Sequence, residues 1–371
     1  MPADGGTSGS SAEVNQVAEL VENGEKVVLK MKELSLFSNG VFSNVYKGKL
    51  TEPQARSIAI KKSWSREETF QRPIEVRILN VLNQYHHKNI IKLLYIFGQK
   101  HPDGTTCTAL VFEFFPTNLH DVRVNYGPLS TIDVKLYTWQ LFRGQAHLEQ
   151  HHICHRDIKP QNLLIDHNSG MLKISDFGSS KILHGDVSSY NYHVTRYYRA
   201  PELILGSSRY RCEIDRWSCG CVFGELLKNH VLLPGRSTNN QLQLIIDVLG
   251  FPTDENVKAM RCTKKLLQTS TFKHYVRKLP LPDGFQSITH SSDQEGLELL
   301  RRVLVYNPGD RLYGPAFLAD PYFDELFDPR TTRNGKILDT VTPQDKEDAL
   351  NGDEGDSGSV SLHASETFNS K

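Results

Sequence analysis

The sequence predicts an α+β fold, with a smaller β-rich N-terminal part followed by a larger, mainly helical part. From about residue 27 to residue 110 the pattern is mostly one of short strands, and residues 44–49 and 58–62 alternate apolar and polar side chains as half-buried strands do. Beyond Pro116 the spacing of apolar residues becomes helical. One apolar stripe is formed by Val134, Tyr137, Leu141 and Leu148.

Composition narrows the class of protein. The 371 residues include 43 Lys and Arg and 43 Asp and Glu, so the formal charge is zero, which argues against a general nucleic-acid or membrane-surface binder. No apolar run approaches the ~18 residues of a membrane span, and the first residues lack a signal-peptide pattern. The six cysteines show no C-x-x-C spacing. We therefore expect reduced, mostly buried thiols and a location in the cytoplasm, possibly also the nucleus.

Both ends of the chain look unlike a folded domain. Residues 1–29 begin with Gly, Ser, Ala and Glu and contain no aromatic residue, so we expect a flexible N-terminal arm. Residues 328–371 become acidic and rich in Gly and Ser, and we expect a disordered tail. One folded domain is left at residues 30–327, with a small lobe over about 30–113 and a large lobe over about 116–327.

The most informative stretch is His155–Asn162, which reads HRDIKPQN. It contains a carboxylate, a cation and an amide, and an Asp-Phe-Gly follows at 176–178 after a short predicted strand at 171–175. Phosphoryl transfer needs a proton acceptor, a cation on the moving group and two oxygen ligands for Mg²⁺. Asp157, Lys159, Asn162 and Asp176 supply these four parts. Ala200-Pro201-Glu202 downstream completes a motif order that chance does not explain.

Two charged residues of the N-terminal part fit the same chemistry. Lys61 ends the strand Ile-Ala-Ile-Lys and would hold the α- and β-phosphates, although a Lys at a strand end is often only a solvated charge. Glu75 lies in a predicted helix and is the natural ion-pair partner of Lys61, and the alternative is an exposed helix carboxylate.

The segment 37–45, FSNGVFSNV, has two interpretations. By itself it predicts a hairpin closed by Asn39-Gly40. In context it occupies the place of a glycine-rich phosphate-covering loop, G-x-G-x-x-G, in which only Gly40 remains and Ser38 and Ser43 replace the outer glycines.

With these residues placed, the chain resembles a eukaryotic Ser/Thr protein kinase over roughly residues 30–327, and more narrowly the glycogen synthase kinase 3 (shaggy-like) subfamily. The segments that carry the resemblance are VKLYTWQLFR, ICHRDIKPQNLLID, DFGSSK, TRYYRAPELILG and residues 214–249. The resemblance implies a bilobal kinase fold with ATP and Mg²⁺ in the cleft, and proteins as substrates. It also implies Ser or Thr as the acceptor, because tyrosine kinases lack the Lys at the position of Lys159.

The resemblance assigns roles to individual residues. Asp157 would accept the proton, Lys159 would contact the γ-phosphate, and Asn162 and Asp176 would bind the metal. Phe112 would form the back wall of the adenine pocket, and the backbone of Glu113 and Phe115 would hydrogen-bond the base. The full set expected around the nucleotide is Phe37, Ser38, Gly40, Ser43, Val45, Ala59, Lys61, Phe112, Glu113, Phe115, Gln161, Asn162, Leu164 and Asp176.

A second group concerns substrate phosphate and the activation segment. The residues expected there are Arg156, Lys181, Tyr192 and Arg199, and Tyr192 matches the tyrosine that this subfamily autophosphorylates. Glu202 and Arg311 match a buried pair that ties the activation segment to the large lobe. We expect a monomer, and scaffold partners cannot be carried over because residues 260–281 depart from the subfamily's scaffold-binding segment.

Three further departures modify these expectations. The subfamily binds a priming phosphate with three basic residues, and Ile74 replaces the third of them, so we expect a weaker preference for primed substrates. If Ser38 and Ser43 must adopt positive φ, each costs about 1–2 kcal/mol and ATP use is impaired. No Arg precedes Ser8, Ser10 or Ser11, so the inhibitory phosphorylation of the arm lacks its recognition site.

Other classes of function are weaker alternatives. The altered glycine loop would suit a pseudokinase scaffold that binds partners without phosphotransfer, but all the charged and amide groups that the chemistry requires are present. A nucleotide-binding metabolic enzyme would need a G-x-x-x-x-G-K-[ST] or an intact G-x-G-x-x-G, and neither occurs. The histidines His151, His152 and His155 lack the further ligands of a metal site.

Overall fold

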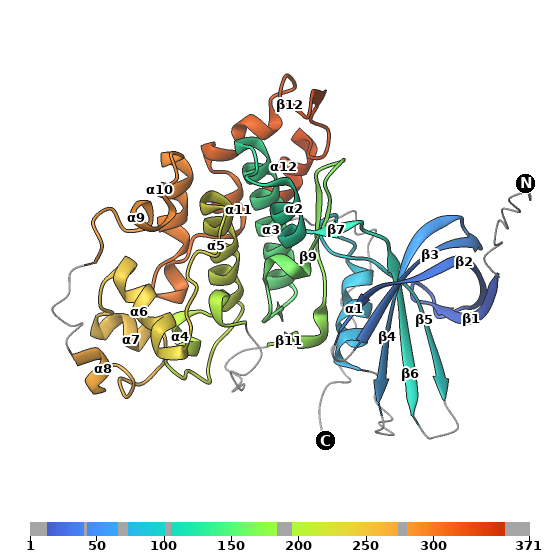
Figure 1. The fold of residues 1–371 in the computed structure, drawn as a ribbon, viewed down its shortest axis with the longest axis horizontal. Coiled ribbons are helices and arrows are strands. Elements are labelled where there is room, and N and C mark those ends of the chain that lie inside the picture. The colour runs from blue at the N-terminus through green and yellow to red at the C-terminus, as the bar shows by residue number, and fades with distance from the viewer. Residues whose placement is uncertain are drawn as a thin grey trace, which may run out of the picture.

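The computed structural model describes residues 13–40, 43–65, 73–100, 105–183, 195–273 and 280–352. Two lobes lie side by side, a β-barrel lobe formed by the N-terminal part and a larger helical lobe formed by the rest (Figure 1). Helix α1 (Ile74–Gln84) lies between the barrel strands and the helices of the large lobe. The α+β, two-lobed architecture predicted from the sequence is confirmed.

The small lobe is a closed barrel with the strand order β1-β2-β3-β4-β6-β5, antiparallel throughout. Its strands are β1 (Val14–Leu20), β2 (Lys26–Asn39), β3 (Ser43–Glu52), β4 (Arg56–Ser65), β5 (Leu93–Lys100) and β6 (Thr106–Glu113). Alternate residues point inward, and Leu29, Met31 and Ile58 are among the buried residues that fill the barrel. This barrel forms one side of the predicted nucleotide pocket.

The predicted flexible arm is partly wrong. Residues 14–29, which the sequence assigned to it, form β1 and the start of β2. Strand β1 pairs with β2 from Val14↔Met31 to Glu19↔Lys26, and also with β5 at Leu20↔Tyr95. The composition argument counted only the apolar area that this segment buries, whereas its backbone gains ladder hydrogen bonds from two neighbouring strands. Residues 1–12, including Ser8, Ser10 and Ser11, lie outside the described residues.

The large lobe is built around α3 (Thr131–Gln150) and α5 (Glu213–Lys228), which pack against each other. Around them are the remaining α-helices: α2 (Leu119–Tyr126), α4 (Pro201–Ile204), α6 (Thr238–Leu249), α7 (Asp254–Ala259), α8 (Ser270–Lys273), α9 (Phe285–Thr289), α10 (Gln294–Val303), α11 (Gly314–Leu318) and α12 (Pro343–Leu350). Both central helices are buried on nearly every side. These two helices therefore give rigid support to the segments that carry the predicted catalytic residues.

Short elements carry the functional residues between the lobes. They are β7 (Thr117–Asn118), β8 (Ile153–Cys154), η1 (Pro160–Asn162), β9 (Leu163–Asp166), β10 (Met171–Ile174), η2 (Phe177–Ser179), β11 (Lys181–Ile182) and η3 (Arg196–Tyr198). The C-terminal part of the large lobe adds η5 (Pro308–Asp310), η6 (Pro321–Phe327), β12 (Thr332–Arg333) and β13 (Lys336–Ile337). Strand β10 confirms the strand expected before Asp-Phe-Gly.

Gly144 lies at the closest approach between α3 and the site. A Cβ atom there would come within 2.9 Å of the Ile174 side chain and 3.2 Å of the Asn89 carbonyl oxygen. A glycine in a helix interior costs about 1 kcal/mol relative to Ala. Here the missing side chain lets β10 and the α1–β5 connection lie directly on α3.

The predicted disordered tail is wrong for residues 328–352, which fold back over the large lobe as β12, β13 and α12. Two buried ion pairs with α3 hold this segment, Arg333–Asp133 and Asp345–Arg143, each at 2.6 Å. Asp345 also pairs with Lys88 at 2.8 Å and caps α12 together with Thr342. The acidic composition suggested solvation, but Asp345 binds a cation on α3, and Arg333 binds an acid on α3, both far away in the sequence. Residues 353–371 lie outside the described part.

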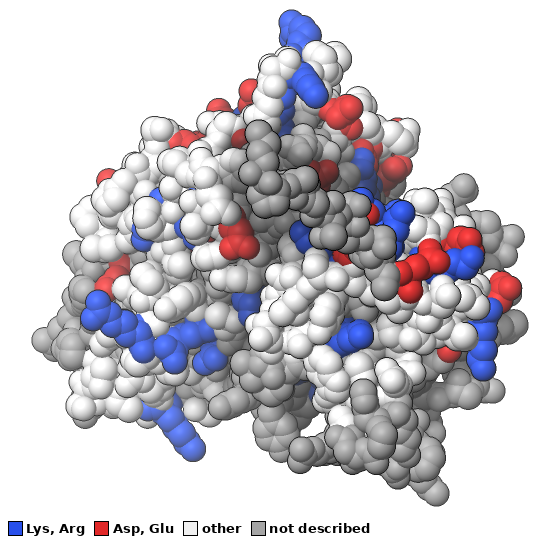
Figure 2. Space-filling model, turned by 45° about the vertical axis from the view of Figure 1, so that its right-hand side comes forward, with Lys and Arg blue, Asp and Glu red and all other residues white. Residues whose placement is uncertain are grey.

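The distribution of surface charge and the state of the cysteines agree with what the composition predicts. On the face shown in Figure 2, acidic and basic side chains adjoin over the small lobe, and a row of basic side chains crosses the large lobe. The six cysteines are free, and five of them are buried. Among the described helices, none combines the length and apolar character needed to cross a membrane.

We predict that Asp345→Ala lowers the free energy of unfolding by about 2–4 kcal/mol at pH 7, because it leaves the buried Arg143 without its carboxylate. Burial opposes ionisation, but Lys88 and Arg143 hold the pKa of Asp345 below its ordinary value. The stabilisation is therefore present above the unfolded-state pKa of about 4 and is lost as the pH falls through the folded-state value.

Urea unfolding of the wild type and the variant measures this difference. Asp348→Ala is the matched control, because Asp348 is in the same helix and bonds only the exposed Gln344 side chain. Equal effects of the two substitutions at pH 7 would contradict the anchoring role of Asp345.

Candidate active site

A cavity of about 320 Å³ lies between the barrel and the large lobe. Thirteen of the fourteen residues predicted around the nucleotide line it: Phe37, Ser38, Ser43, Val45, Ala59, Lys61, Phe112, Glu113, Phe115, Gln161, Asn162, Leu164 and Asp176. Gly40 is not among the lining residues. The sequence did not indicate the other lining residues, which are Glu75 (expected only as an ion-pair partner), Leu79, Ile91, Phe114, Asn118, Ser175 and Phe177.

The segment 37–45 is the hairpin between β2 and β3. Asn39 pairs with Asn44, and the Gly40 amide donates to the Ser43 carbonyl oxygen at 2.9 Å. A Cβ atom on Gly40 would come within 3.0 Å of that oxygen, so a side chain there would require a small shift of the turn. The Phe37 ring meets the Phe114 ring edge to face at 5.5 Å, which places an aromatic contact over the pocket mouth.

The expected backbone strain at Ser38 and Ser43 is not present. Both residues lie within strands, and neither is among the described residues with positive φ. Ser38 pairs with Val45 just after a register shift between Leu36 and Ser38, and Ser43 pairs with Ser63 in a regular antiparallel register. The premise of the ATP-impairment hypothesis is therefore wrong, because an extended backbone accommodates serine as readily as glycine.

The connection between the lobes presents backbone groups to the pocket. Phe112, the penultimate residue of β6, pairs with Ala59 and Leu93. The Glu113 carboxylate binds the Lys173 ammonium at 2.7 Å and the Lys92 amide at 3.1 Å. Because the Glu113 side chain is held by these two groups, its backbone is fixed at the edge of the pocket.

Lys61 on β4 joins three elements. Its ammonium lies 2.7 Å from the Glu75 carboxylate on α1 and 2.9 Å from the Asp176 carboxylate. Burial disfavours the charge on Lys61, but the two carboxylates outweigh this and raise its pKa. Burial likewise acts to raise the pKa of Asp176, and Lys61 reverses this and lowers it. The predicted Lys61–Glu75 pair is confirmed, and Lys61 is charged at neutral pH.

Asp176 is placed by the residues around it. It adopts a left-handed conformation with φ of 63°, which turns the chain sharply between β10 and η2. Phe177 is fully buried, and its ring meets the His155 ring at 5.1 Å. His155 in turn donates from Nε2 to the Ser175 carbonyl oxygen at 2.9 Å. The Nε2 atom of His155 carries this hydrogen bond, whereas a metal ligand would offer a free ring nitrogen to the metal.

Asp157 lies at the centre of a dense hydrogen-bond network. Lys159 donates to its Oδ2 at 2.6 Å, and the Thr195 hydroxyl donates to its Oδ1 at 2.7 Å. The Asn162 amide donates to the Asp157 carbonyl at 2.8 Å and to Oδ2 at 3.2 Å. Three residues predicted from one eight-residue segment are thus brought together. Thr195 was not among the residues singled out from the sequence.

Asp215 was also missed, and it fixes the backbone of the catalytic segment. This buried residue near the start of α5 accepts the His155 amide at 2.6 Å and the Arg156 amide at 2.9 Å. Arg156 adopts φ of 66°, a conformation that non-glycine residues rarely adopt. Burial raises the pKa of Asp215, while His155 and the two amides oppose the rise. An Asp inside an otherwise buried helix was the signal that could have revealed it.

The metal-binding prediction can be tested against the donor set. Asn162 uses its Nδ2 on Asp157, so its Oδ1 is the atom left for a metal. The Asp176 side chain is 47% exposed and uses Oδ1 on Lys61, so Oδ2 is left. Oxygen donors of this kind suit Mg²⁺. Among the described residues, no group of three or more His, Cys, Asp or Glu could hold a metal by itself.

The residues expected to bind substrate phosphate lie beside the catalytic segment. Arg156 donates to the Ser179 carbonyl at 2.6 Å and to the Tyr210 hydroxyl at 3.2 Å. Lys181 of β11 pairs with Cys154 of β8, and Cys154 is two residues before Arg156 in the chain. Burial, and then Arg196, lowers the pKa of Arg199. Tyr192 lies outside the described residues.

The activation segment is tied down by a buried ion pair. Arg311 makes two hydrogen bonds of 2.7 Å to the Glu202 carboxylate, and both side chains are at most 2% exposed. This confirms the pairing expected from the resemblance.

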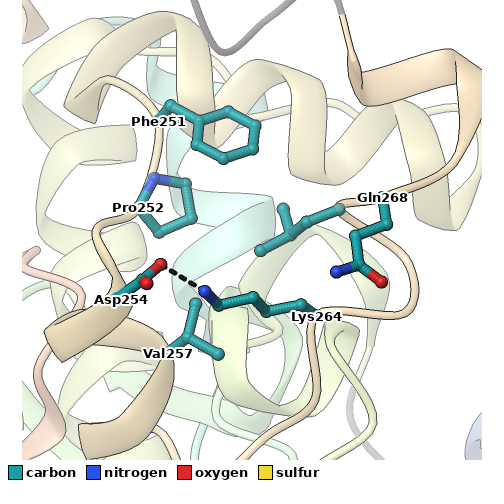
Figure 3. A pocket seen from close by; sticks show the side chains of 7 residues that line it. Phe251, Pro252, Asp254, Val257, Lys264 and Gln268 are labelled. Atoms are coloured by element: carbon teal, nitrogen blue, oxygen red, sulfur yellow. Dashed lines mark hydrogen bonds and ion pairs between the residues drawn. The ribbon is translucent and has the colours of Figure 1, made fainter.

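A second cavity lies in the large lobe, away from these residues (Figure 3). Phe251, Pro252 and Val257 line it, and Asp254 and Lys264 form an ion pair across it. None of the residues placed around the nucleotide lines this cavity.

Comparison with known proteins agrees with this geometry. The protein kinase domain family matches residues 31–323. Glycogen synthase kinase 1 of Pyricularia oryzae is 36% identical over 83% of this chain and 76% of its own length. Protein kinase gsk3 of Schizosaccharomyces pombe is 34% identical over 89% and 84%. A putative serine/threonine-protein kinase of Caenorhabditis elegans, gskl-1, is 33% identical over 84% and 85%.

The chain belongs to the protein kinase family. Within that family it is a Ser/Thr protein kinase of the glycogen synthase kinase 3 type, an ATP-dependent phosphotransferase that acts on proteins. Its family uses ATP and Mg²⁺.

We predict that Asp215→Ala lowers kcat by about 10- to 100-fold with little change in KM for ATP, since it frees the backbone that positions Asp157 without touching the nucleotide pocket. Steady-state kinetics measure both constants. Asp215→Asn is the second variant, because its single carbonyl oxygen can accept only part of the two amide bonds, and we expect an intermediate kcat. A parallel loss of kcat and rise of KM would contradict a role limited to positioning.

Proposed function

We propose that this kinase transfers the γ-phosphoryl group of ATP to protein hydroxyls with Asp157 as the proton acceptor and Lys159 on the moving group. The observation that carries the proposal is the convergence of Lys159, Asn162 and Thr195 on Asp157 within 3.3 Å, beside the cavity that Lys61 and Asp176 line. Each side chain is held by at least one partner, so the groups are arranged before substrate binds.

The residues have distinct tasks in this proposal. Asp157 orients the acceptor hydroxyl and takes up its proton, and Thr195 and Lys159 fix its two carboxylate oxygens. Lys61 binds the α- and β-phosphates and is kept charged by Glu75. Asn162 and Asp176 would hold Mg²⁺, which neutralises charge on the phosphates when bound.

The alternative of an inactive scaffold rested on the altered glycine loop. The serines of that loop sit in extended strands without strain, and the ion pair that an active kinase requires between β4 and α1 is formed. We find no observation that favours the scaffold.

The transfer experiment compares the wild type with Asp157→Asn. With labelled ATP and a generic protein acceptor, we expect the variant to lose about 10²- to 10⁴-fold in kcat, the contribution of one general base. KM for ATP should stay within about threefold, because Asp157 is not among the residues lining the nucleotide cavity. Equal rates for the two proteins would end the proposal.

We also propose that preference for primed substrates is reduced. Ile74 begins α1 and is 39% exposed, and α1 packs against β11, which carries Lys181. Arg156 and Lys181 supply two cations, and Ile74 supplies none. A charge-assisted hydrogen bond contributes about 1.5–3 kcal/mol. Its absence lowers phosphate affinity by roughly 10- to 100-fold. Arg72, the nearest alternative cation, lies outside the described residues.

We predict that Ile74→Arg raises the ratio of kcat/KM for phosphorylated over unphosphorylated peptide by about 10-fold or more, by adding the third cation. Matched peptides that differ only in the priming phosphate measure the ratio. Ile74→Leu keeps the apolar side chain and should leave it unchanged. A wild-type ratio as large as that of Ile74→Arg would contradict the proposal.

A monomeric state and a location in the cytoplasm, possibly also the nucleus, stay predictions from the sequence. Arm phosphorylation and the modification of Tyr192 concern residues outside the described part, and they too stay predictions.

A further inference from the structure

A third cavity, of about 300 Å³, lies behind the nucleotide pocket at the C-terminal end of α1. Leu82, Ile90 and Ile91 supply apolar walls, and the polar lining includes Lys88, Lys92 and Lys173. His86 and His87 add to it, and none of the described residues that line the cavity is acidic. This lining suits an anionic group that also brings a short aliphatic stem.

The lysines differ in their partners. Lys173 binds Glu113 at 2.7 Å, and Lys88 binds Asp345 at 2.8 Å. The Lys92 ammonium has no ion pair or hydrogen bond with any described residue. Burial, followed by Lys92, lowers the pKa of His86, whereas Glu22 has the opposite effect. Among the described residues that line the cavity, Lys92 is therefore a cation without a carboxylate partner.

Carboxylates from the C-terminal segment already bind at the rim of this cavity. Asp345 of α12 reaches Lys88, and the same carboxylate bonds Arg143 of α3. The chain thus passes the cavity with one acid bound and continues along the large lobe to Leu350.

The place where the described chain ends is close to the cavity. Gly352 lies against the end of α3, where the Gln150 amide is 3.6 Å from the position that a Cβ atom would take. His151, which follows Gln150 in the chain, stacks on Tyr85 with ring centroids 4.3 Å apart. Tyr85 directly precedes His86 of the cavity lining. An extended segment of four residues after Gly352 spans at most about 13 Å.

Those residues read Asp353-Glu354-Gly355-Asp356, three carboxylates and one glycine. We propose that this acidic segment of the same chain binds the lysine-lined cavity behind α1, with a carboxylate on Lys92. The proposal is independent of the catalytic assignments, because none of Asp157, Asn162 and Asp176 lines this cavity.

Binding there would act on the nucleotide pocket through Ile91. Ile91 lines both this cavity and the nucleotide pocket. Helix α1, whose C-terminal end borders this cavity, also carries Glu75, which binds Lys61. An occupied cavity braces the C-terminal end of α1 from behind.

Zero-length carbodiimide crosslinking of the full chain, followed by peptide mass spectrometry, tests the proposal. We expect amide crosslinks from Lys92 to Asp353, Glu354 or Asp356 in the monomer fraction, with lower yield in 0.5 M salt than in 0.05 M salt, conditions of about 4 Å and 14 Å screening length. A mixture of ¹⁴N- and ¹⁵N-labelled chains identifies the source. Crosslinks within one label support the proposal, and crosslinks only between labels overturn it.

A second measurement uses the acylation rate of Lys92. Neutralising the segment by Asp353→Asn, Glu354→Gln and Asp356→Asn together should raise that rate about two- to fivefold, as expected for one exposed ion pair. Glu366→Gln, further along the tail, is the matched control, and exposed Lys258 on α7 is the reference amine. Urea unfolding of the variants checks that they fold as the wild type does. An unchanged Lys92 rate, or an equal effect of Glu366→Gln, overturns the proposal.

Discussion

The arrangement of this kinase depends on one partly buried cation shared by two carboxylates. Lys61 belongs to the barrel, Glu75 to α1 and Asp176 to the segment that leaves β10. Glu75 and Asp176 are far apart in the sequence, so the Lys61 ammonium between them fixes the distance between the two carboxylates. With α1 drawn toward the barrel, its inner face packs in the same apolar cluster as α3 and α5. One interaction therefore sets both the position of the metal-ligand candidate Asp176 and the contact between the lobes.

The large lobe supplies the rigidity against which this cation works. The catalytic segment has little regular structure of its own, and its backbone is held instead by buried polar groups of neighbouring elements. Asp215 accepts two of its amides, and Ser175 accepts the His155 ring. Buried acceptors of this kind are stable only when their donors are in place. The loop conformation and the packing of α5 are therefore linked, and a change in either affects the other.

Much of the site was predictable from the sequence because its residues lie close together in the chain. Asp157, Lys159 and Asn162 span six positions, and their chemistry restricts how such a segment can fold. Thr195 and Asp215 could not be found in this way, because only the folded chain brings them to Asp157 and to the amides of His155 and Arg156. For the same reason the order of residues 328–352 was missed, as Asp345 and Arg143 are 202 positions apart. The strain expected at Ser38 failed for a different reason, since a motif carries no information on φ.

The family match ends at residues 31 and 323, but the folded unit continues beyond both. Strand β1 closes the barrel by covering β2 and β5, and α12 covers α3. A fragment cut at the family limits would leave two sheet edges with unpaired amides and carbonyls, the feature that promotes edge-to-edge association of proteins. The small lobe of this kinase is thus completed by sequence that lies outside the family match.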